Sequence, residues 1–132
     1  MSATLSPAAR ELVDRPVIAA FTTLDAHGAP HTTPVWIDRD GDDLLVNTAS
    51  GRAKPRNLAA DPRVSVCLFD PDDPMNVVAI QGTVVDVTTN GAVAHIDALA
   101  KKYTGADSFG GHVEGRDRLI VRIRCDRVLS VG

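Results

Sequence analysis

Six short runs of strand-like sequence, joined mostly by turn residues rather than by helices, most constrain the fold of this chain. The clearest run spans residues 117–131, where apolar and charged side chains alternate. A period of two is typical of a strand with one face in a core and one face outside it. We therefore expect the charged set to form a solvated strand face. The apolar set is Leu119, Val121, Ile123 and Cys125, and the charged set is Arg118, Arg122 and Arg124.

Two residues mark irregular points in the other runs. Pro34 lies inside one run, and because proline has no N–H to donate, that strand is expected to be irregular or at a sheet edge. Gly82 lies inside the run over residues 76–88, the longest of the other five, and is expected to bend that strand, as the corner of a barrel requires. The five runs occupy residues 17–24, 31–38, 44–48, 64–69 and 76–88.

Three short helices are expected beside the strands. Ser6 is a favoured N-cap, Pro7 suits a first turn, and Pro16 stops the helix that they begin. The second helix is expected over residues 53–60. The third is expected over residues 93–103, where apolar residues recur at helical spacing.

Together these elements predict a mainly β fold, a six-stranded antiparallel barrel with short helices, in a single domain over residues 1–132. The order of elements does not alternate strands with helices, so it excludes a doubly wound nucleotide-binding fold. The sequence also lacks the glycine-rich phosphate-binding motifs of such folds.

Charge and hydropathy argue against two classes of partner. The chain has 14 Lys and Arg against 17 Asp and Glu, a net charge of −3 that is not typical of a nucleic-acid-binding protein. No apolar run approaches the roughly 18 residues of a membrane helix, and the N-terminus lacks the pattern of a secretory signal. Cys67 and Cys125 lie far apart in no metal-ligand spacing. We expect a cytoplasmic protein with no bound metal.

Conventional catalytic groups are scarce. Glu11 and Glu114 are the only glutamates, and most of the 15 aspartates fall in turns. His27 and His31 flank a turn, and we interpret them as polar turn residues rather than metal ligands. No G-x-S-x-G nucleophile motif is present. The sequence assigns no catalytic residue and does not favour hydrolysis.

The segment 51–63 departs from the acidic balance of the chain. It holds four basic side chains and one acidic one, a local charge of +3, so the rest of the chain carries −6. Arg52 and Lys54 lie at the start of the helix expected over 53–60, whose free N–H groups and dipole attract an anion. Asn57 adds an amide donor one turn further on. The pattern favours a phosphate site, with a solvated charged segment as the alternative.

Two stretches carry a resemblance to a known family: TTLDAHGAPHTTPVW over residues 22–36 and LVNTASGRAKPRNLAADPRVSV over residues 45–66. With these motifs in this order, the chain resembles the pyridoxamine 5′-phosphate oxidase-like split β-barrel family. Within that family it looks most similar to the actinobacterial branch that uses the deazaflavin coenzyme F-420. The resemblance covers roughly residues 17–131 and is most specific over 52–58 and 61–63.

The resemblance implies a split barrel that forms a homodimer, with two identical cofactor sites at the subunit interface. By this resemblance Arg52 and Lys54 hold the phosphate of the cofactor, with Asn57 in support. The other implied contacts are Thr33, Pro34, Val35 and Trp36 along the ring, Thr48, Ala49 and Ser50 along the ribityl chain, and Met75, Asn76 and Val78 toward the site of the neighbouring subunit.

The resemblance also implies an activity, in which a hydride passes between the reduced deazaflavin and an unsaturated small-molecule acceptor. Since the cofactor carries such chemistry, few acid–base residues are needed. Solvent, Tyr103 or His112 is expected to supply the accompanying proton, the last from a polar, glycine-rich and mobile loop over residues 104–115. An acidic tail of the cofactor is the alternative partner for the arginines of 117–131.

Two other functions stay open. FMN also has a tricyclic ring and a phosphate, so an FMN-binding enzyme of the same family is the nearest alternative. The second is a protein that binds or stores the deazaflavin without turnover. Pyridoxamine-phosphate oxidation itself is not expected, because the sequence ends at Gly132, straight after the last strand expected, without the C-terminal segment of that subgroup.

Overall fold

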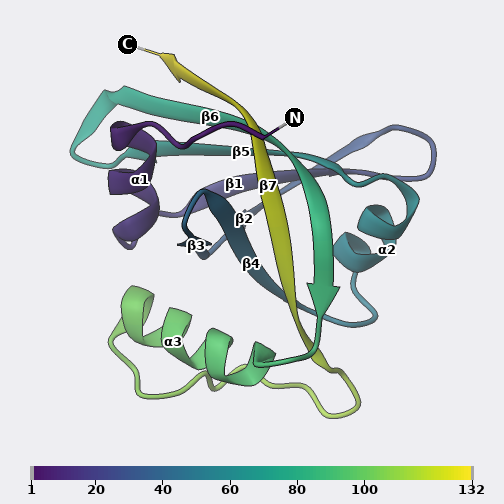
Figure 1. Ribbon diagram of the computed structural model, residues 1–132. Coiled ribbons are helices and arrows are strands. Elements are labelled where there is room, and N and C mark those ends of the chain that lie inside the picture. The colour runs from purple at the N-terminus through teal and green to yellow at the C-terminus, as the bar shows by residue number, and fades with distance from the viewer. Residues whose placement is uncertain (1, 132) are drawn as a thin grey trace.

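The computed structural model describes residues 2–131, and its strands form one antiparallel sheet that curls on itself (Figure 1). The strand order is β2-β1-β5-β6-β7-β4-β3. This confirms the mainly β class, with three short helices beside a curled sheet. The elements are α1 (Pro7–Asp14), β1 (Ala19–Leu24), β2 (Pro30–Val35), β3 (Ile37–Asp40), β4 (Asp43–Ala49), α2 (Ala53–Ala60), β5 (Arg63–Asp70), β6 (Asp73–Thr88), α3 (Ala92–Thr104) and β7 (Arg118–Val131).

The expected strand over 31–38 is two strands, which is why the sheet has seven rather than six. β2 pairs with β1, and β3 pairs with β4. β2 and β3 are the two opposite edge strands of the sheet. Trp36 joins them, so the chain passes from one edge of the curled sheet to the other at this residue. Pro34 therefore lies in an edge strand, as its missing N–H predicts. We call this break between β2 and β3, at Trp36, the split of the barrel.

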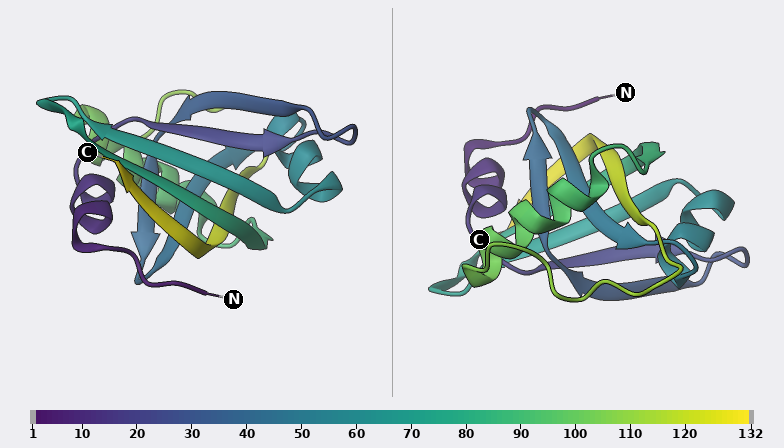
Figure 2. Two further views of the ribbon diagram at one scale, coloured as in Figure 1. Left: turned by 90° about the horizontal axis from the view of Figure 1, so that it is seen from above. Right: turned by 90° about the horizontal axis from the view of Figure 1, so that it is seen from below.

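The core fills the inside of the curl. Val121, Ile123 and Cys125 of β7 are buried, while the arginines that alternate with them are partly exposed, as the sequence pattern predicts. Helix α1 lies near one end of the sheet, and Ser6 caps it by accepting a hydrogen bond from the N–H of Ala9 at 3.2 Å. Seen from above and below, the sheet wraps around this core and α3 lies across its lower side (Figure 2).

The bend expected at Gly82 is present. The pairing of β6 with β7 shifts register between Gln81 and Gly82, and Gly82 is buried. A Cβ atom at this position would lie 2.5 Å from Cγ2 of Ile123 and 2.7 Å from the carbonyl oxygen of Arg124. The bulge thus brings β7 so close to β6 that only glycine fits.

Arg15, just after α1, ties that helix to the β5–β6 hairpin. Its guanidinium donates to both carboxylate oxygens of Asp70, at 3.0 and 3.2 Å, and lies 3.3 Å from Asp72. The hydrogen bond from Arg15 lowers the pKa of Asp70 to about 2.

We expect this pair to make stability depend on acid. Because the folded pKa of Asp70 lies below its unfolded value of about 3.9, the stabilisation is complete above about pH 4 and is lost as the pH falls toward 2. Arg15→Gln is therefore expected to unfold more easily than wild type at pH 7 and equally easily near pH 2, by urea titration. The control is Arg10→Gln on the same helix. A stability difference that persists undiminished at pH 2 would contradict the assignment.

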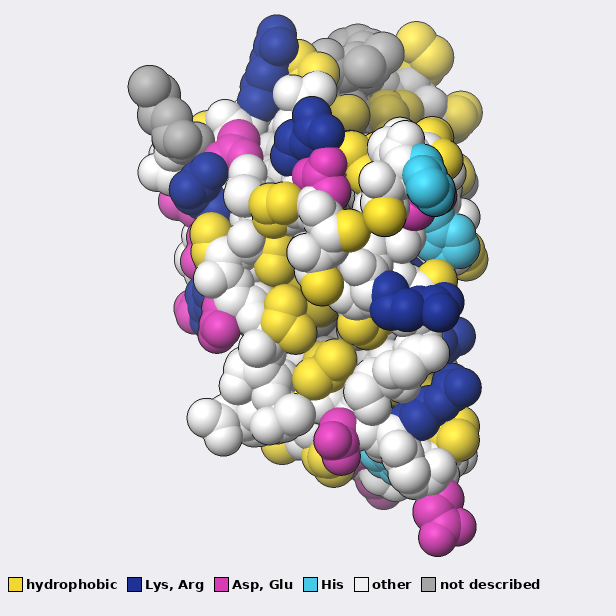
Figure 3. Space-filling view, turned by 90° about the vertical axis from the view of Figure 1, so that its right-hand side faces the viewer, with side chains coloured by type: hydrophobic (Ala, Val, Ile, Leu, Met, Phe, Trp, Pro, Cys, Tyr) yellow, Lys and Arg dark blue, Asp and Glu magenta, His cyan; other side chains and the backbone are white. Residues whose placement is uncertain are grey.

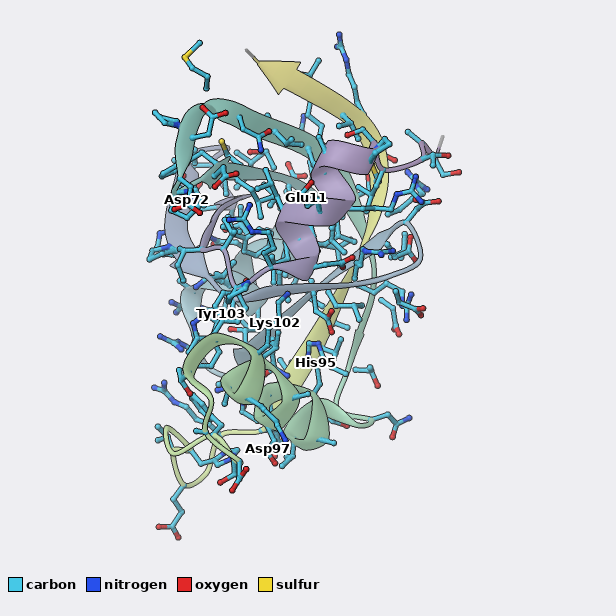
Figure 4. All side chains as sticks on the ribbon, turned by 90° about the vertical axis from the view of Figure 1, so that its left-hand side faces the viewer. Glu11, Asp72, His95, Asp97, Lys102 and Tyr103 are labelled. Carbon is cyan, nitrogen blue, oxygen red and sulfur yellow. The ribbon has the colours of Figure 1, made fainter. Side chains whose placement is uncertain are left out.

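Helix α3 is attached to the sheet by its last turns. The ammonium group of Lys102 donates to the carbonyl oxygens of Val13 and Ile37, and the hydroxyl of Tyr103 donates to that of Val17 at 2.7 Å. Figure 4 shows His95, Lys102 and Tyr103 on the side of α3 toward the sheet, with Asp97 on the other side. None of the helices over residues 2–131 is long and apolar enough to cross a membrane.

Candidate functional site

A cleft of about 330 Å³ opens beside the split of the barrel. The segment around Trp36 forms one wall, β4 another, and the start of α2 a third; α3 and the loop after it complete the lining. Six of the 13 sequence-predicted site residues line this cleft. Those six are Pro34, Val35, Trp36, Thr48, Arg52 and Lys54, and the others in the lining are Ile18, Asn47, Ile96, Leu99, Phe109 and Arg118.

The aromatic wall is built on Trp36. Its ring stacks on that of Tyr103 with centroids 5.4 Å apart, and the ring of Phe109 meets it edge-on at 6.1 Å. The hydroxyl of Tyr103 is hydrogen-bonded to backbone groups of Val17 and Ile37, so the ring on which Trp36 stacks is fixed in place. A flat aromatic surface in a cleft lined by both apolar and cationic side chains is suited to a planar ring.

The cationic wall is the start of α2. Arg52 is the N-cap, but no side chain caps the helix, so its first-turn N–H groups are available to a ligand. Burial lowers the pKa of Lys54, and the charge of Arg52 lowers it further. Over residues 2–129, whose side chains the structure describes, no carboxylate forms an ion pair with either residue. Figure 3 looks onto the side that carries α2, where basic side chains lie beside hydrophobic ones.

The exposed Arg52 and the partly buried Lys54, neighbouring cations without a carboxylate partner among the described residues, are an arrangement that an anion would stabilise. Their charges repel each other in the protein alone, and a bound phosphate would relieve that repulsion and add charge-assisted hydrogen bonds. The residues present therefore fit a cofactor with a planar ring at Trp36 and a phosphate at Arg52 and Lys54.

Three of the other predicted residues lie close to the cleft. Thr33 is on β2, and its hydroxyl oxygen is buried with no hydrogen-bond partner among the described residues, so its capacity is free for a ligand. Ala49 lines a second hollow of about 260 Å³, which shares Arg52 with the cleft. The hydroxyl oxygen of Ser50 accepts from the N–H of Asp117 at 2.9 Å and so anchors the start of β7.

Asn57 faces inward from α2. Its amide nitrogen donates to the hydroxyl of the buried Thr23 at 2.9 Å, which ties α2 to β1. The amide nitrogen of Asn57 is thus used to position the helix, and Asn57 does not line the cleft.

The three residues expected to reach a neighbouring subunit lie near the start of β6. Met75 is exposed, and Asn76 is partly buried and donates to Asp70 at 3.3 Å. Val78 is fully buried in the core, so its side chain does not reach the surface. None of the three lines the cleft of its own chain.

The two side chains considered as proton donors are placed differently. The hydroxyl of Tyr103 donates to Val17 and accepts from the N–H of Ile37 at 3.0 Å, and burial raises its pKa, so its proton is committed to the fold. His112 is exposed, with its ring edge-on to Phe109 at 5.3 Å. Solvent and His112 are the sources consistent with this arrangement.

Six lining residues were not among those predicted for the site, and three of them are polar or aromatic: Asn47, Phe109 and Arg118. The sequence offered Arg118 only as one of three arginines with an acidic cofactor tail as the alternative partner. Phe109 belongs to a segment that the glycine content marked only as a mobile loop. In the structure its N–H donates to Asp97 at 2.9 Å, and its ring lies beside Arg118. The sequence signal that could have pointed to Phe109 is the pair of glycines that follows it. In the structure the Phe109 ring lies so close to Gly111 that a Cβ there would be 2.4 Å from it.

The described residues 2–131 hold no group of three or more His, Cys, Asp or Glu side chains arranged for a metal ion. The side chains that line the cleft include cations, an amide and aromatic rings.

The curled sheet, with its split at Trp36 and its cationic cleft, defines a split-barrel protein. The chain belongs to the pyridoxamine 5′-phosphate oxidase family, whose model matches residues 5–132. No curated protein matches the sequence.

Solved structures support the same assignment. An F-420 reductase has a TM-score of 0.82 and 27% sequence identity, over 91% of this chain and 94% of that chain. A conserved hypothetical protein from Mycobacterium tuberculosis has a TM-score of 0.75 at 20% identity, over 98% and 86%. HutZ, a heme storage protein from Vibrio cholerae, has a TM-score of 0.67 at 14% identity, over 98% and 96%. The last two show the fold alone.

Proposed function

We propose that the protein is an oxidoreductase that uses the deazaflavin coenzyme F-420 to transfer a hydride between the reduced coenzyme and an unsaturated small-molecule acceptor. The observation that carries the proposal is the pair of cations, the exposed Arg52 and the partly buried Lys54, at a helix start without a side-chain cap, beside the ring of Trp36. The likeness to the F-420 reductase, at 27% identity, supports the choice of coenzyme.

The coenzyme supplies the hydride chemistry, and the protein supplies binding and placement. Arg52, Lys54 and the first-turn N–H groups of α2 hold the phosphate. Trp36 and the free edge of β2 orient the planar ring, with the buried hydroxyl of Thr33 as a polar contact. The apolar side chains of Ile96 and Leu99 in α3 limit the access of water to the ring.

Paired titrations test the coenzyme. Cofactor-free protein is titrated with oxidised coenzyme F-420 and with FMN, and fluorescence reports binding. The proposal expects tight binding of the deazaflavin and weak binding of FMN. The reverse order would move the protein to the FMN-dependent part of the family. Tight deazaflavin binding without faster oxidation by any unsaturated acceptor would instead favour a storage protein.

We further propose that the protein is a homodimer in the cytoplasm, where its two free cysteines would stay reduced. The sheet offers an apolar outer row for the second copy. In this row Ala20 lies opposite Pro34 and Cys67, Cys67 opposite Ala79, and Ala79 opposite Leu129.

Two observations link this row to the cleft. Its end residue, Pro34, also lines the cleft, as does Ile18, which is 49% exposed. The same face of the sheet also carries Phe69, two residues after Cys67 on β5, which is 56% exposed and lies opposite Val77. A second copy packed on this face would therefore border the cleft and cover apolar surface that a monomer leaves in water.

The dimer is tested by mass in solution. Wild type is expected near 28 kDa, twice the chain mass of 14.0 kDa. Ala79→Arg places a charge in the middle of the row and is expected to give a monomer with weakened coenzyme binding. Val93→Arg, at an exposed position on α3, is the control and should remain a dimer. A wild-type monomer that binds coenzyme stoichiometrically would contradict the shared-site proposal.

A further inference from the structure

Three of the four arginines of β7, Arg118, Arg122 and Arg124, alternate with its buried side chains, and they do not share one role. Arg122 donates to Asp43 at 3.0 Å and to Asp40 at 2.9 Å. Arg124 donates to Asp126 at 2.7 Å. These two charges are balanced by carboxylates, and the interpretation of a surface strand face holds for them.

Arg118 differs from Arg122 and Arg124 both in its location and in its hydrogen-bond partners. It lines the cleft, and among residues 2–129 no carboxylate pairs with it. Its partners are neutral: Nε donates to the amide oxygen of Asn47 at 2.9 Å, and the guanidinium lies 5.0 Å from the centre of the Phe109 ring. Burial lowers the pKa of Arg118, and the charge of Arg52 lowers it further. The guanidinium of Arg118 is thus not balanced by a carboxylate among residues 2–129, and it lines the same cleft as Arg52 and Lys54.

Asn47 fixes the direction of that charge. Its amide nitrogen donates one hydrogen to the carbonyl oxygen of Ala92 at 2.9 Å and the other to Nδ1 of His95 at 3.1 Å. With both amide hydrogens used, the amide oxygen is left pointing at Arg118. Nε2 of His95 lies 3.5 Å from the carboxylate of Asp38 but makes no hydrogen bond among the described residues, so the imidazole is held through Nδ1.

We propose that Arg118 is a third cationic ligand for the anionic, phosphate-bearing chain of the coenzyme, and that Asn47 is the positioning residue that holds it in the cleft. The inference rests on the proposed function for the identity of the ligand. Since only Nε is bound to Asn47, the two terminal nitrogens of the guanidinium are free to donate to an oxyanion, for which the planar fork is suited.

The test is a double-mutant cycle read by titration with oxidised coenzyme F-420. Arg118→Gln is expected to raise the dissociation constant about 10- to 100-fold, as for the loss of a charged hydrogen bond. Asn47→Ala is expected to raise it less, because the charge stays but is no longer directed. The double variant should bind no more weakly than Arg118→Gln alone, since Asn47 acts through Arg118. Thermal unfolding checks that each variant is folded.

The matched control is Arg122→Gln, which removes an arginine from the same strand face outside the cleft. It should bind the coenzyme as wild type does. Equal affinity of Arg118→Gln and wild type would overturn the inference, and additive losses in the double variant would overturn the positioning role of Asn47.

A second probe separates this inference from the proposed function. Trp36 is the only tryptophan and lines the cleft, so its fluorescence reports the binding of inorganic phosphate without any coenzyme. If wild type binds neither coenzyme F-420 nor FMN, the proposed function fails. Phosphate binding that is weakened in Arg118→Gln but not in Arg122→Gln then supports Arg118 as an anion ligand, and equal binding in all three overturns it.

Discussion

Replacing Gly82 with Ala is expected to destabilise the protein by about 3 kcal/mol, toward the upper end of the usual effect of crowding a core. The added Cβ would lie 2.5 Å from the side chain of Ile123 and 2.7 Å from the carbonyl oxygen of Arg124. A side chain can rotate away, but the carbonyl belongs to the backbone of β7. Relief of the contact therefore requires β6 and β7 to separate next to the bulge, within the longest strand pairing of the sheet.

For a chain of this length, such a loss corresponds to a fall in Tm of about 10 °C. Gly110→Ala is the control, because nothing lies within 4 Å of a Cβ there and its backbone needs no left-handed conformation. That variant should stay within about 0.5 kcal/mol of wild type. A Gly82→Ala variant as stable as wild type would show that the bulge relaxes without cost and that the glycine serves another purpose.

Much of the fold could be predicted, because local rules determine it. The helix over 53–60 has the bounds expected from the sequence, and the alternation in 117–131 correctly separates the buried side of β7 from its charged side. The break at Trp36 was not predicted. Residues 31–38 read as one strand locally, and the break arises only because the two halves pair with opposite edges of the sheet.

The same distinction applies to the site. Arg52 and Lys54 are recognisable because their charges stand together at a helix start in the sequence. Arg118 is not, since its charge looks the same as those of Arg122 and Arg124 along the strand. The difference lies in what β4 and the neighbouring loops bring to each arginine: carboxylates for Arg122, and an amide and an aromatic ring for Arg118. Such differences depend on register across the sheet, which one sequence does not specify.

Replacing Lys54 with Ala is expected to weaken coenzyme binding by about 1.5–3 kcal/mol, the range for a hydrogen bond to a charged group. In a fluorescence titration this is a rise in the dissociation constant of about 10- to 150-fold. The fold should remain intact, because in the protein alone the ammonium group makes no hydrogen bond or ion pair with any side chain described over residues 2–129. Lys101→Ala, at an exposed position on α3, is the control for loss of a positive charge.

Lys54→Met gives a sharper form of the same test. It keeps the apolar stem of the side chain and removes the charge, whose pKa is lowered by burial and by Arg52. Since that buried, unpaired charge opposes folding until an anion arrives, the variant is expected to unfold at a slightly higher temperature than wild type while binding the coenzyme more weakly. Opposite changes in stability and affinity are the signature of a charge retained for a ligand. A variant that loses stability and keeps its affinity would instead make Lys54 a structural residue and remove the phosphate from this wall of the cleft.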